Sequence, residues 1–429
     1  MAPLSRVIID TDPGIDDILA LLLALSSRSD EIEVQLISLT FGNIDVRSCL
    51  RNVVSMFHII EQELKWRREN GKPEGFDALK AFKPTVAVGA DRPLDDELMM
   101  ADYFHGRDGL GDIHYSHPHL TPKQAWESLF SLTGNGTAEA EVESALDGHH
   151  SSFVASKKPA YQEILRVLKE NEPDTITIIA VGPLTNLALA AAEDPETFLR
   201  AKEVVVMGGT VNLPGNVTPV AEFNTYADAS AAARVYALTS PRPQSTLPPL
   251  NPSAPKPLPA YPPTLSKQLT LKLFPLDITH PHDITRGQFR AKTAPIAAAG
   301  SPLAEWLSII LSHSFATLDA LHPGHDGDKA ALSLHDPLCV WYALTRESPR
   351  WTLSAGSPED IRVDTTGQWT KGMSVVDRRN RKRRDDDAVS ASDHGHWLSN
   401  LAGNRVQRME GSPGTEVFGG WLLDRIFGV

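Results

Sequence analysis

Short apolar runs alternate along this chain with longer stretches of helical periodicity. The runs typical of buried strands are Arg6–Asp10, Val34–Phe41, Thr85–Gly89, Thr175–Val181 and Glu203–Met207. The stretches expected to be helices are Ile15–Ser26, Arg47–Leu64, Leu184–Ala192, Ala227–Ala237, Pro302–Leu318 and Pro337–Leu344. Strands that alternate with helices are typical of a parallel sheet that helices cover. We therefore expect an α/β fold, with a mainly parallel, Rossmann-like central sheet flanked by helices.

Four stretches interrupt this pattern and are expected to be long loop insertions that add little to a core. They lie at about 65–83, 133–158, 241–263 and 377–400. The third has ten prolines in 23 positions, which excludes a regular helix. The fourth holds the basic run 378–384, which could be a nuclear-import or anion patch, although a solvated loop is the better interpretation. With no internal repeat, residues 1–429 are expected to form one domain.

Charge and cysteine content narrow the class of protein. A net charge of −13 argues against a nucleic-acid-binding surface, which needs a basic face. Cys49 and Cys339 are the only cysteines, so no disulfide framework is implied and an intracellular protein is expected. The first residues do not resemble a secretory signal, and the longest apolar stretch, Ile18 to Leu25, is too short to span a membrane. We expect a cytoplasmic protein.

An acidic turn directly follows the first apolar run. Its four carboxylates belong to Asp10, Asp12, Asp16 and Asp17. In an open α/β sheet, ligands bind beyond the carboxyl ends of the strands. Like charges held there repel unless a cation or hydrogen-bond donors stabilise them, and oxygen ligands suit a hard cation such as Ca²⁺ or Mg²⁺. The alternative is a solvated turn whose aspartates only cap the next helix.

Several sequence blocks together resemble the inosine-uridine nucleoside hydrolase family in order and approximate spacing. They are Asp10-Thr11-Asp12-Pro13-Gly14-Ile15-Asp16-Asp17, Thr40-Phe41-Gly42-Asn43, Gly182-Pro183-Leu184-Thr185-Asn186, Val206-Met207-Gly208-Gly209, Ala221-Glu222-Phe223-Asn224 and His335-Asp336-Pro337. The chain resembles a fungal-type member with long insertions. The resemblance implies an enzyme, a homodimer or homotetramer, that hydrolyses the N-glycosidic bond of uridine- or inosine-type ribonucleosides to free base and ribose.

The resemblance also implies a calcium site. Asp12, Asp17 and Asp336 would bind Ca²⁺ through their side chains, and Val181 through its backbone carbonyl. Substrate hydroxyls and a water would complete the six to eight oxygens that calcium takes. A water on the cation loses proton affinity, and Asp12 could accept its proton as the water attacks. Asp336 could also be an N-cap, and magnesium is the alternative metal.

For the sugar, the resemblance implies a set of polar side chains and one apolar contact. Asp16 would bind the vicinal hydroxyls with Asn43 and Asn224 nearby. Such groups are needed because cleavage passes through an oxocarbenium-like sugar. The residues matched to the 5′-hydroxyl and to the apolar contact are Asn216, Glu222 and Met207. Met207 could equally be an ordinary core residue.

A nucleobase leaves more readily when it is protonated as the bond breaks, and histidine is the natural donor near neutral pH. His335, beside Asp336, is the first candidate for this catalytic acid, and His105 is a second residue expected to line the base pocket. The sequence around His105 departs from the family pattern at Arg107 and Asp108. Two other functions stay open: a non-catalytic nucleoside- or metal-binding relative, and a phosphatase of the haloacid dehalogenase type, which also begins with a strand and Asp-x-Asp.

Overall fold

The structure is a computed structural model, and it describes residues 4–122, 126–130, 152–249, 257–321, 327–385 and 392–428. A nine-stranded sheet runs through its middle in the order β10 (Thr352–Leu353), β13 (Gln407–Gly411), β7 (Leu271–Phe274), β6 (Glu203–Met207), β5 (Ile176–Ala180), β1 (Ser5–Thr11), β2 (Ile32–Leu39), β3 (Thr85–Val88), β4 (Val154–Ala155). Each neighbouring pair is parallel except β10 and β13. The predicted single-domain α/β fold with a mainly parallel sheet is confirmed.

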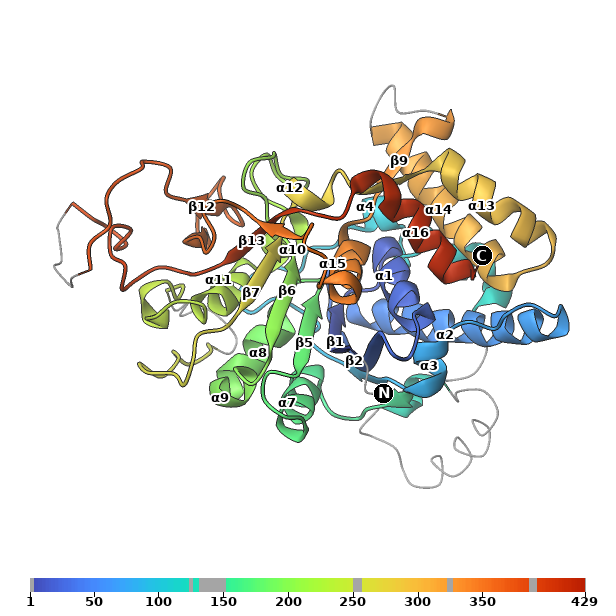
Figure 1. Cartoon of the computed structure of the whole chain (residues 1–429), viewed down its shortest axis with the longest axis horizontal. Helices are drawn as coiled ribbons and strands as arrows, with labels where there is room; N and C mark the ends of the chain where they lie inside the picture. The colour runs from blue at the N-terminus through green and yellow to red at the C-terminus, as the bar shows by residue number, and fades with distance from the viewer. Residues whose placement is uncertain are drawn as a thin grey trace.

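Helices cover both faces of the sheet (Figure 1). One face carries α1 (Ile15–Ser26), α2 (Val46–Glu69), α14 (Pro302–Leu321), α15 (His335–Thr345) and α16 (Thr415–Phe427); the other carries α7 (Ala160–Glu170), α8 (Thr185–Glu193) and α11 (Ala229–Ala237). Successive strand residues enter opposite cores, so Ile9 packs with the first group and Ile8 with the second. Both are fully buried.

The remaining elements are short or peripheral. The helices among them are α3 (Asp77–Ala81), α4 (Asp102–His105), α5 (Ile113–Ser116), α9 (Pro195–Phe198), α10 (Phe223–Ala227), α12 (Leu276–Thr279) and α13 (Arg286–Ala298). Two antiparallel pairs, β8 (Asp283–Thr285) with β9 (Ala331–Ser333) and β11 (Ile361–Val363) with β12 (Ser374–Val376), lie outside the main sheet. The 3₁₀ turns are η1 (Pro118–Leu120), η2 (Trp126–Phe130), η3 (Pro243–Ser245) and η4 (Gly327–Lys329).

Each predicted strand and helix has a counterpart in the structure, with two differences. The stretch Ala227–Ala237 is not one helix, because Asp228 leaves the helical conformation and its side chain accepts the Ala231 N–H as the N-cap of α11. The stretch 65–83 was expected to add little core, and this expectation is wrong. Helix α2 continues to Glu69, and Phe76 is fully buried.

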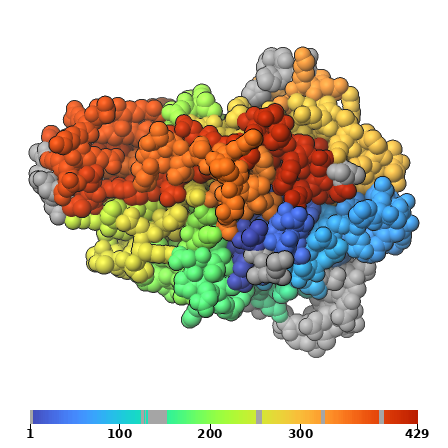
Figure 2. Space-filling view, viewed as in Figure 1, coloured from blue at the N-terminus to red at the C-terminus, as the bar shows by residue number. Residues whose placement is uncertain are grey.

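The other three insertions behave differently from one another. Of 133–158, only the end from residue 152 is described, and it adds β4 at the edge of the sheet. In 241–263 the described parts contain no helix beyond the turn η3, as the prolines predicted, although Tyr261 is buried. Residues 377–385 and 392–400 follow β12 in the C-terminal excursion that projects from one end of the molecule (Figures 1 and 2).

The topology defines where a ligand would bind. Strand β1 pairs with β2 on one side and with β5 on the other, so the chain order reverses at β1. In α/β sheets a crevice forms at such a switch point, outside the carboxyl ends of the strands. The turn after β1 lies at this point. No helix within the described ranges is long and apolar enough to cross a membrane.

Candidate active site

The turn between β1 and α1 is held in shape by the side chain of Asp17. Its carboxylate accepts four hydrogen bonds: from the Thr11 hydroxyl at 2.5 Å, the Asp12 N–H at 3.2 Å, the Gly14 N–H at 3.1 Å and the Asn43 amide at 2.9 Å. These donors use about all the acceptor sites of one carboxylate. Asp17 is therefore the residue that fixes the turn. A cation bound to Asp17 would share the carboxylate oxygens of this residue with the four donors.

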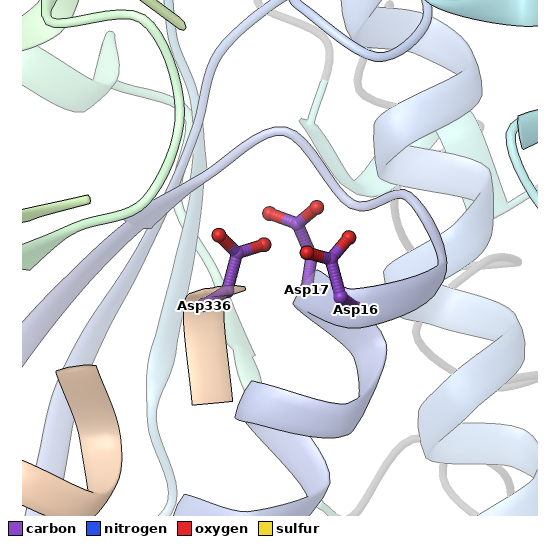
Figure 3. Close-up of side chains that lie close together, drawn as sticks. All are labelled: Asp16, Asp17 and Asp336. Carbon is purple, nitrogen blue, oxygen red and sulfur yellow. The ribbon is translucent and has the colours of Figure 1, made fainter. Parts of the chain in front are cut away.

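Three carboxylates converge beside this turn (Figure 3). Asp16 and Asp17 stand at the start of α1, and Asp336 stands at the start of α15. Each offers a ligand atom within 4.8 Å of the others, and this is the group of acidic side chains found close enough to share a cation in the described part of the chain. Residues 319 positions apart in sequence are thus brought together by the packing of α15 against α1.

Asp12 lies beside this group in a tightly packed position. One of its carboxylate oxygens accepts the Asn43 N–H at 2.6 Å, and the other is buried without a hydrogen-bond partner. A Cβ on Gly42 would lie 2.0 Å from the first oxygen, and a Cβ on Gly182 would lie 2.5 Å from the second. Glycine at these two positions therefore lets the chain close around Asp12.

Burial and mutual repulsion raise the pKa of these carboxyls. The pKa of Asp16 rises to about 7, first through burial and then through the charge of Asp17. The pKa values of Asp12 and Asp336 rise well above their ordinary range for the same two kinds of reason, burial first. Burial also raises the pKa of Asp17, against the pull of its donors. A site with these properties favours added positive charge.

The fourth carboxylate of the acidic turn, Asp10, does not join this group. It is fully buried and accepts hydrogen bonds from the Ser38 hydroxyl and, at 2.9 Å, from the Asn186 amide. Asn186 also donates to the Leu39 carbonyl and accepts the Ala90 N–H. Asp10 therefore belongs to a polar link that joins the ends of neighbouring strands.

Four more of the predicted site residues come from the carboxyl ends of three strands and from α10. The amide of Asn43, after β2, reaches both Asp17 and the Asp12 carbonyl. Asn224, on α10, donates to the Val181 carbonyl at 2.8 Å and lies 3.4 Å from the Met207 sulfur. The structure thus gathers Val181, Met207 and Asn224, and it places Asn43 against Asp12 and Asp17. Met207 is also part of the main hydrophobic core, as the alternative interpretation of this residue predicted, and its contact with a sugar stays a prediction.

Glu222 and Asn216 both hold the first turn of α10. The buried Glu222 carboxylate accepts the N–H groups of Gly209, Asn224 and Thr225 at 2.6–2.9 Å. The side-chain carbonyl of Asn216 accepts the Phe223 N–H at 2.9 Å, and Asn216 itself is exposed. Burial raises the pKa of Glu222 although three donors oppose this. Both residues therefore have a structural role at this end of the site.

The two candidate histidines come from different elements. His105, at the end of α4, is buried and accepts the Ile15 N–H through Nδ1 at 3.2 Å. His335, at the start of α15, lies 2.7 Å from the Thr279 hydroxyl through Nδ1. Burial lowers the pKa of each ring to about 3, and the charges of His313 and His335 add to this effect at His105. Both rings are therefore neutral near pH 7.

Sequence reasoning missed several residues that shape the site. Thr11 donates a hydrogen bond to Asp17, and Thr279 is the hydrogen-bond partner of His335. Thr11 stands inside the acidic block but was given no role, and Thr279 lies outside every block. His313, on α14, has a buried Nε2 without a hydrogen-bond partner and lies close enough to lower the pKa of His105. The sequence predicted the helix that carries His313, but it gave this histidine no role.

Comparison with known proteins identifies the family of this site. Residues 7–395 match the family model described as inosine-uridine preferring nucleoside hydrolase. The chain belongs to this family. Its members cleave N-glycosyl bonds of ribonucleosides, so the predicted enzyme class is confirmed. Among relatives of this nucleoside hydrolase, an uncharacterized protein of Schizosaccharomyces pombe is 30% identical over 373 residues, which cover 87% of this chain and 89% of that protein.

Named relatives and solved structures agree with this placement. The pyrimidine-specific ribonucleoside hydrolase RihA of Salmonella enteritidis is 30% identical over 378 residues, covering 86% of this chain and 88% of its own. A plant nucleoside hydrolase superposes with a TM-score of 0.63 at 23% identity, covering 99% of both chains. A purine-preferring ribonucleoside hydrolase from Gardnerella vaginalis has a TM-score of 0.65 at 20% identity, covering 99% and 98%. These structures establish the shared fold.

Proposed function

We propose that this nucleoside hydrolase cleaves uridine- or inosine-type ribonucleosides to free base and ribose, with Ca²⁺ bound at the turn after β1. The observation that carries this proposal is the convergence of Asp16, Asp17 and Asp336, with Asp12 beside them, at the switch point of the sheet. This position is where α/β proteins bind ligands.

The residues present fit a hard divalent cation. The ligand atoms of the acidic group are oxygens, and one oxygen of the buried Asp12 has no hydrogen-bond partner in the described part of the chain. The cation would be held by the carboxylates of Asp12, Asp17 and Asp336 and by the backbone carbonyl of Val181. This carbonyl also accepts a hydrogen bond from Asn224. When bound, such a cation binds sugar hydroxyls and lowers the pKa of a water. Calcium suits this set better than magnesium, because calcium accepts six to eight oxygens in flexible geometry.

The chain's own residues would then bind and orient the sugar. Asp16 lies within the acidic group and would bind the vicinal ribose hydroxyls, with Asn43 and Asn224 nearby. Glu222 and Asn216 would bind the 5′-hydroxyl, and Met207 would contact the sugar face. Carboxylates around the sugar also stabilise the positive charge that develops on it as the bond breaks. Asp12, with its free oxygen, would accept the proton of the attacking water.

The departing base would receive its proton from His335. The Thr279 hydroxyl engages Nδ1 of this ring, which leaves Nε2 as the nitrogen available to a substrate. Burial keeps His335 neutral in the free site, so the ring would take up a proton from solvent as the nucleoside binds and would then pass this proton to the departing base. His105 would line the base side of the pocket, where it is fixed by the Ile15 N–H.

A product assay tests this proposal. Purified enzyme with Ca²⁺ is incubated with uridine, cytidine, inosine, adenosine and nicotinamide riboside, and free base and ribose are measured. We expect stoichiometric base and ribose from uridine or inosine. Phosphate release from a generic phosphate ester, without ribose release, would favour a phosphatase, and no product from any nucleoside would favour a non-catalytic binding relative.

The variant Asp12→Asn tests the role of the proposed base. It removes both a metal ligand and the proton acceptor, so we expect ribose release to fall by several orders of magnitude. Asn404→Ala, a buried asparagine far from the acidic turn in sequence, serves as a control for general damage to the fold. Near-normal turnover of Asp12→Asn would show that another group activates the water.

A further inference from the structure

The loop 106–114 that follows His105 is built around one buried carboxylate. Asp108, which is 3% exposed, accepts the N–H groups of Leu110 and Asp112 through one oxygen and of His114 through the other, all at 2.8–2.9 Å. This is the position at which the sequence departs from the family pattern. The aspartate at position 108 therefore has a structural role: its three hydrogen bonds fix the path of the loop.

A single side chain of α2 joins this loop to the acidic turn. Asn52 is fully buried, and its amide group donates to the Pro13 carbonyl at 2.8 Å and to the Asp108 carbonyl at 2.9 Å. Pro13 lies between Asp12 and Gly14, inside the turn that Asp17 holds. One amide therefore binds the backbone of both segments at the same time.

The remaining atom of Asn52 fixes its orientation. The Pro13 and Asp108 carbonyls are acceptors, so the amide nitrogen of Asn52 has to face them. Oδ1 then faces His114 Nε2 at 2.8 Å and needs a hydrogen-bond donor there. His114 can supply this proton as the neutral Nε2–H tautomer, because its Nδ1 faces the Thr121 hydroxyl at 2.6 Å. Each polar atom of the Asn52 side chain is thus satisfied, and the orientation that satisfies them is unique.

The acidic turn and the start of α1 also touch His105, the residue directly before this loop. The Ile15 N–H donates to His105 Nδ1, and a Cβ on Gly14 would lie 2.6 Å from that nitrogen. A Cβ on Gly109 would lie 2.8 Å from the Asn52 amide nitrogen, so the loop packs tightly over Asn52 as well. A shift of either segment therefore has to move the other.

We propose that Asn52 is a positioning residue that couples the metal-binding turn to the loop after His105, so that order in one segment stabilises order in the other. This inference rests on the proposed function in that it takes the turn after β1 to be the cation site. Binding of the cation should then protect loop 106–114, and an ordered loop should strengthen cation binding by the same factor.

Hydrogen exchange measured by mass spectrometry tests this coupling without reference to turnover. In the unmodified protein, Ca²⁺ should slow exchange of the amides in 106–114. In Asn52→Leu, which has similar volume and no hydrogen bonds, Ca²⁺ should leave exchange of this loop unchanged and should bind about tenfold more weakly. The matched control is Asn404→Leu. Asn404 is equally buried and uses its amide in the same way, accepting from Thr246 and donating to the Ile361 carbonyl.

A second variant keeps the test decisive if Asn52→Leu does not fold. His114→Phe removes the donor to Oδ1, together with the contact to the Thr121 hydroxyl, but leaves both amide hydrogen bonds of Asn52, so it should weaken the Ca²⁺-dependent protection in part. Where both variants fold, the double variant should be no worse than Asn52→Leu alone, because both act through one side chain. Equal protection by Ca²⁺ in the unmodified protein and in Asn52→Leu would overturn the coupling, as would additive effects in the double variant. Absence of ribose release with intact protection would reject the proposed function and leave the coupling standing.

Discussion

At the scale of single residues, identical side chains have different roles because their surroundings differ. The Asp17 carboxylate accepts four hydrogen bonds and holds the turn, whereas Asp12 keeps one oxygen without a partner. Asp10 also has one oxygen without a partner among the described residues, but its other oxygen accepts from Ser38 and Asn186, and Asp10 lies outside the group that could share a cation. The sequence shows four acids in eight positions, but only the packing shows which of them is available to a ligand.

His335 gives the sharpest prediction at this scale. General acid catalysis contributes about 10²–10⁴-fold, so His335→Ala should slow hydrolysis of uridine or inosine by roughly that factor. A riboside with an already good leaving group, such as nitrophenolate, should be cleaved nearly as fast as by the unmodified protein, and calcium binding should be unchanged. His280→Ala is the control, since its exposed ring lies 6.4 Å from that of His335. Equal losses on both substrates would show that His335 positions the sugar or Asp336.

At the scale of elements, periodic apolar segments could be predicted from the sequence, and segments held by a few distant contacts could not. Helix α1 begins and ends where its pattern predicted. The stretch 65–83 was wrongly predicted to add little core because its composition is polar and charged. Its buried residue Phe76 packs under the Arg67 side chain, which lies over the ring. Likewise, the blocks that resemble the family contain the predicted site residues, whereas Asn52 and Thr279 act through contacts between distant elements and leave no local pattern.

The proline-rich stretch gives a prediction at the scale of elements. Its described ends pack on the protein: Tyr261 is 4% exposed, and the Arg234 side chain lies over its ring. Replacing 248–258 with a short Gly/Ser linker should leave ribose release within a few fold, because surface loops change length at small cost. Tyr261→Ala should lower the melting temperature at unchanged turnover, and Tyr261→Phe should preserve it. An inactive but folded linker variant would show that this stretch builds part of the site.

At the scale of the whole molecule, the buried acids make the stability of the metal-free protein depend on pH. Folding raises the pKa of Asp10 and Asp16 to about 7 and raises the pKa of Asp12 and Asp336 well above its ordinary range, mainly through burial. The folded protein therefore binds more protons than the unfolded chain at these groups. Their contribution to stability is lost as pH rises through the raised pKa values.

Above pH 6.5 an ordinary histidine in the unfolded chain is already mostly neutral, so the acids dominate. We therefore expect the melting temperature of metal-free protein to fall between pH 6.5 and pH 8.5. The rise in melting temperature on adding Ca²⁺ should be larger at pH 8.5, where fewer protons compete for the carboxylates. Differential scanning fluorimetry with and without Ca²⁺ measures both effects. A metal-free melting temperature that stays constant or rises, with an equal Ca²⁺ effect at both values, would contradict this assignment.

The most direct test of the central claim is ribose release from uridine and inosine by enzyme stripped of metal and then titrated with Ca²⁺. Circular dichroism before the assay establishes that the stripped protein is folded. We predict no ribose above background without a cation and a return of ribose release as Ca²⁺ is added, because the four carboxylates around the turn need a positive charge to act together. Full activity of the folded, metal-free protein would contradict the account.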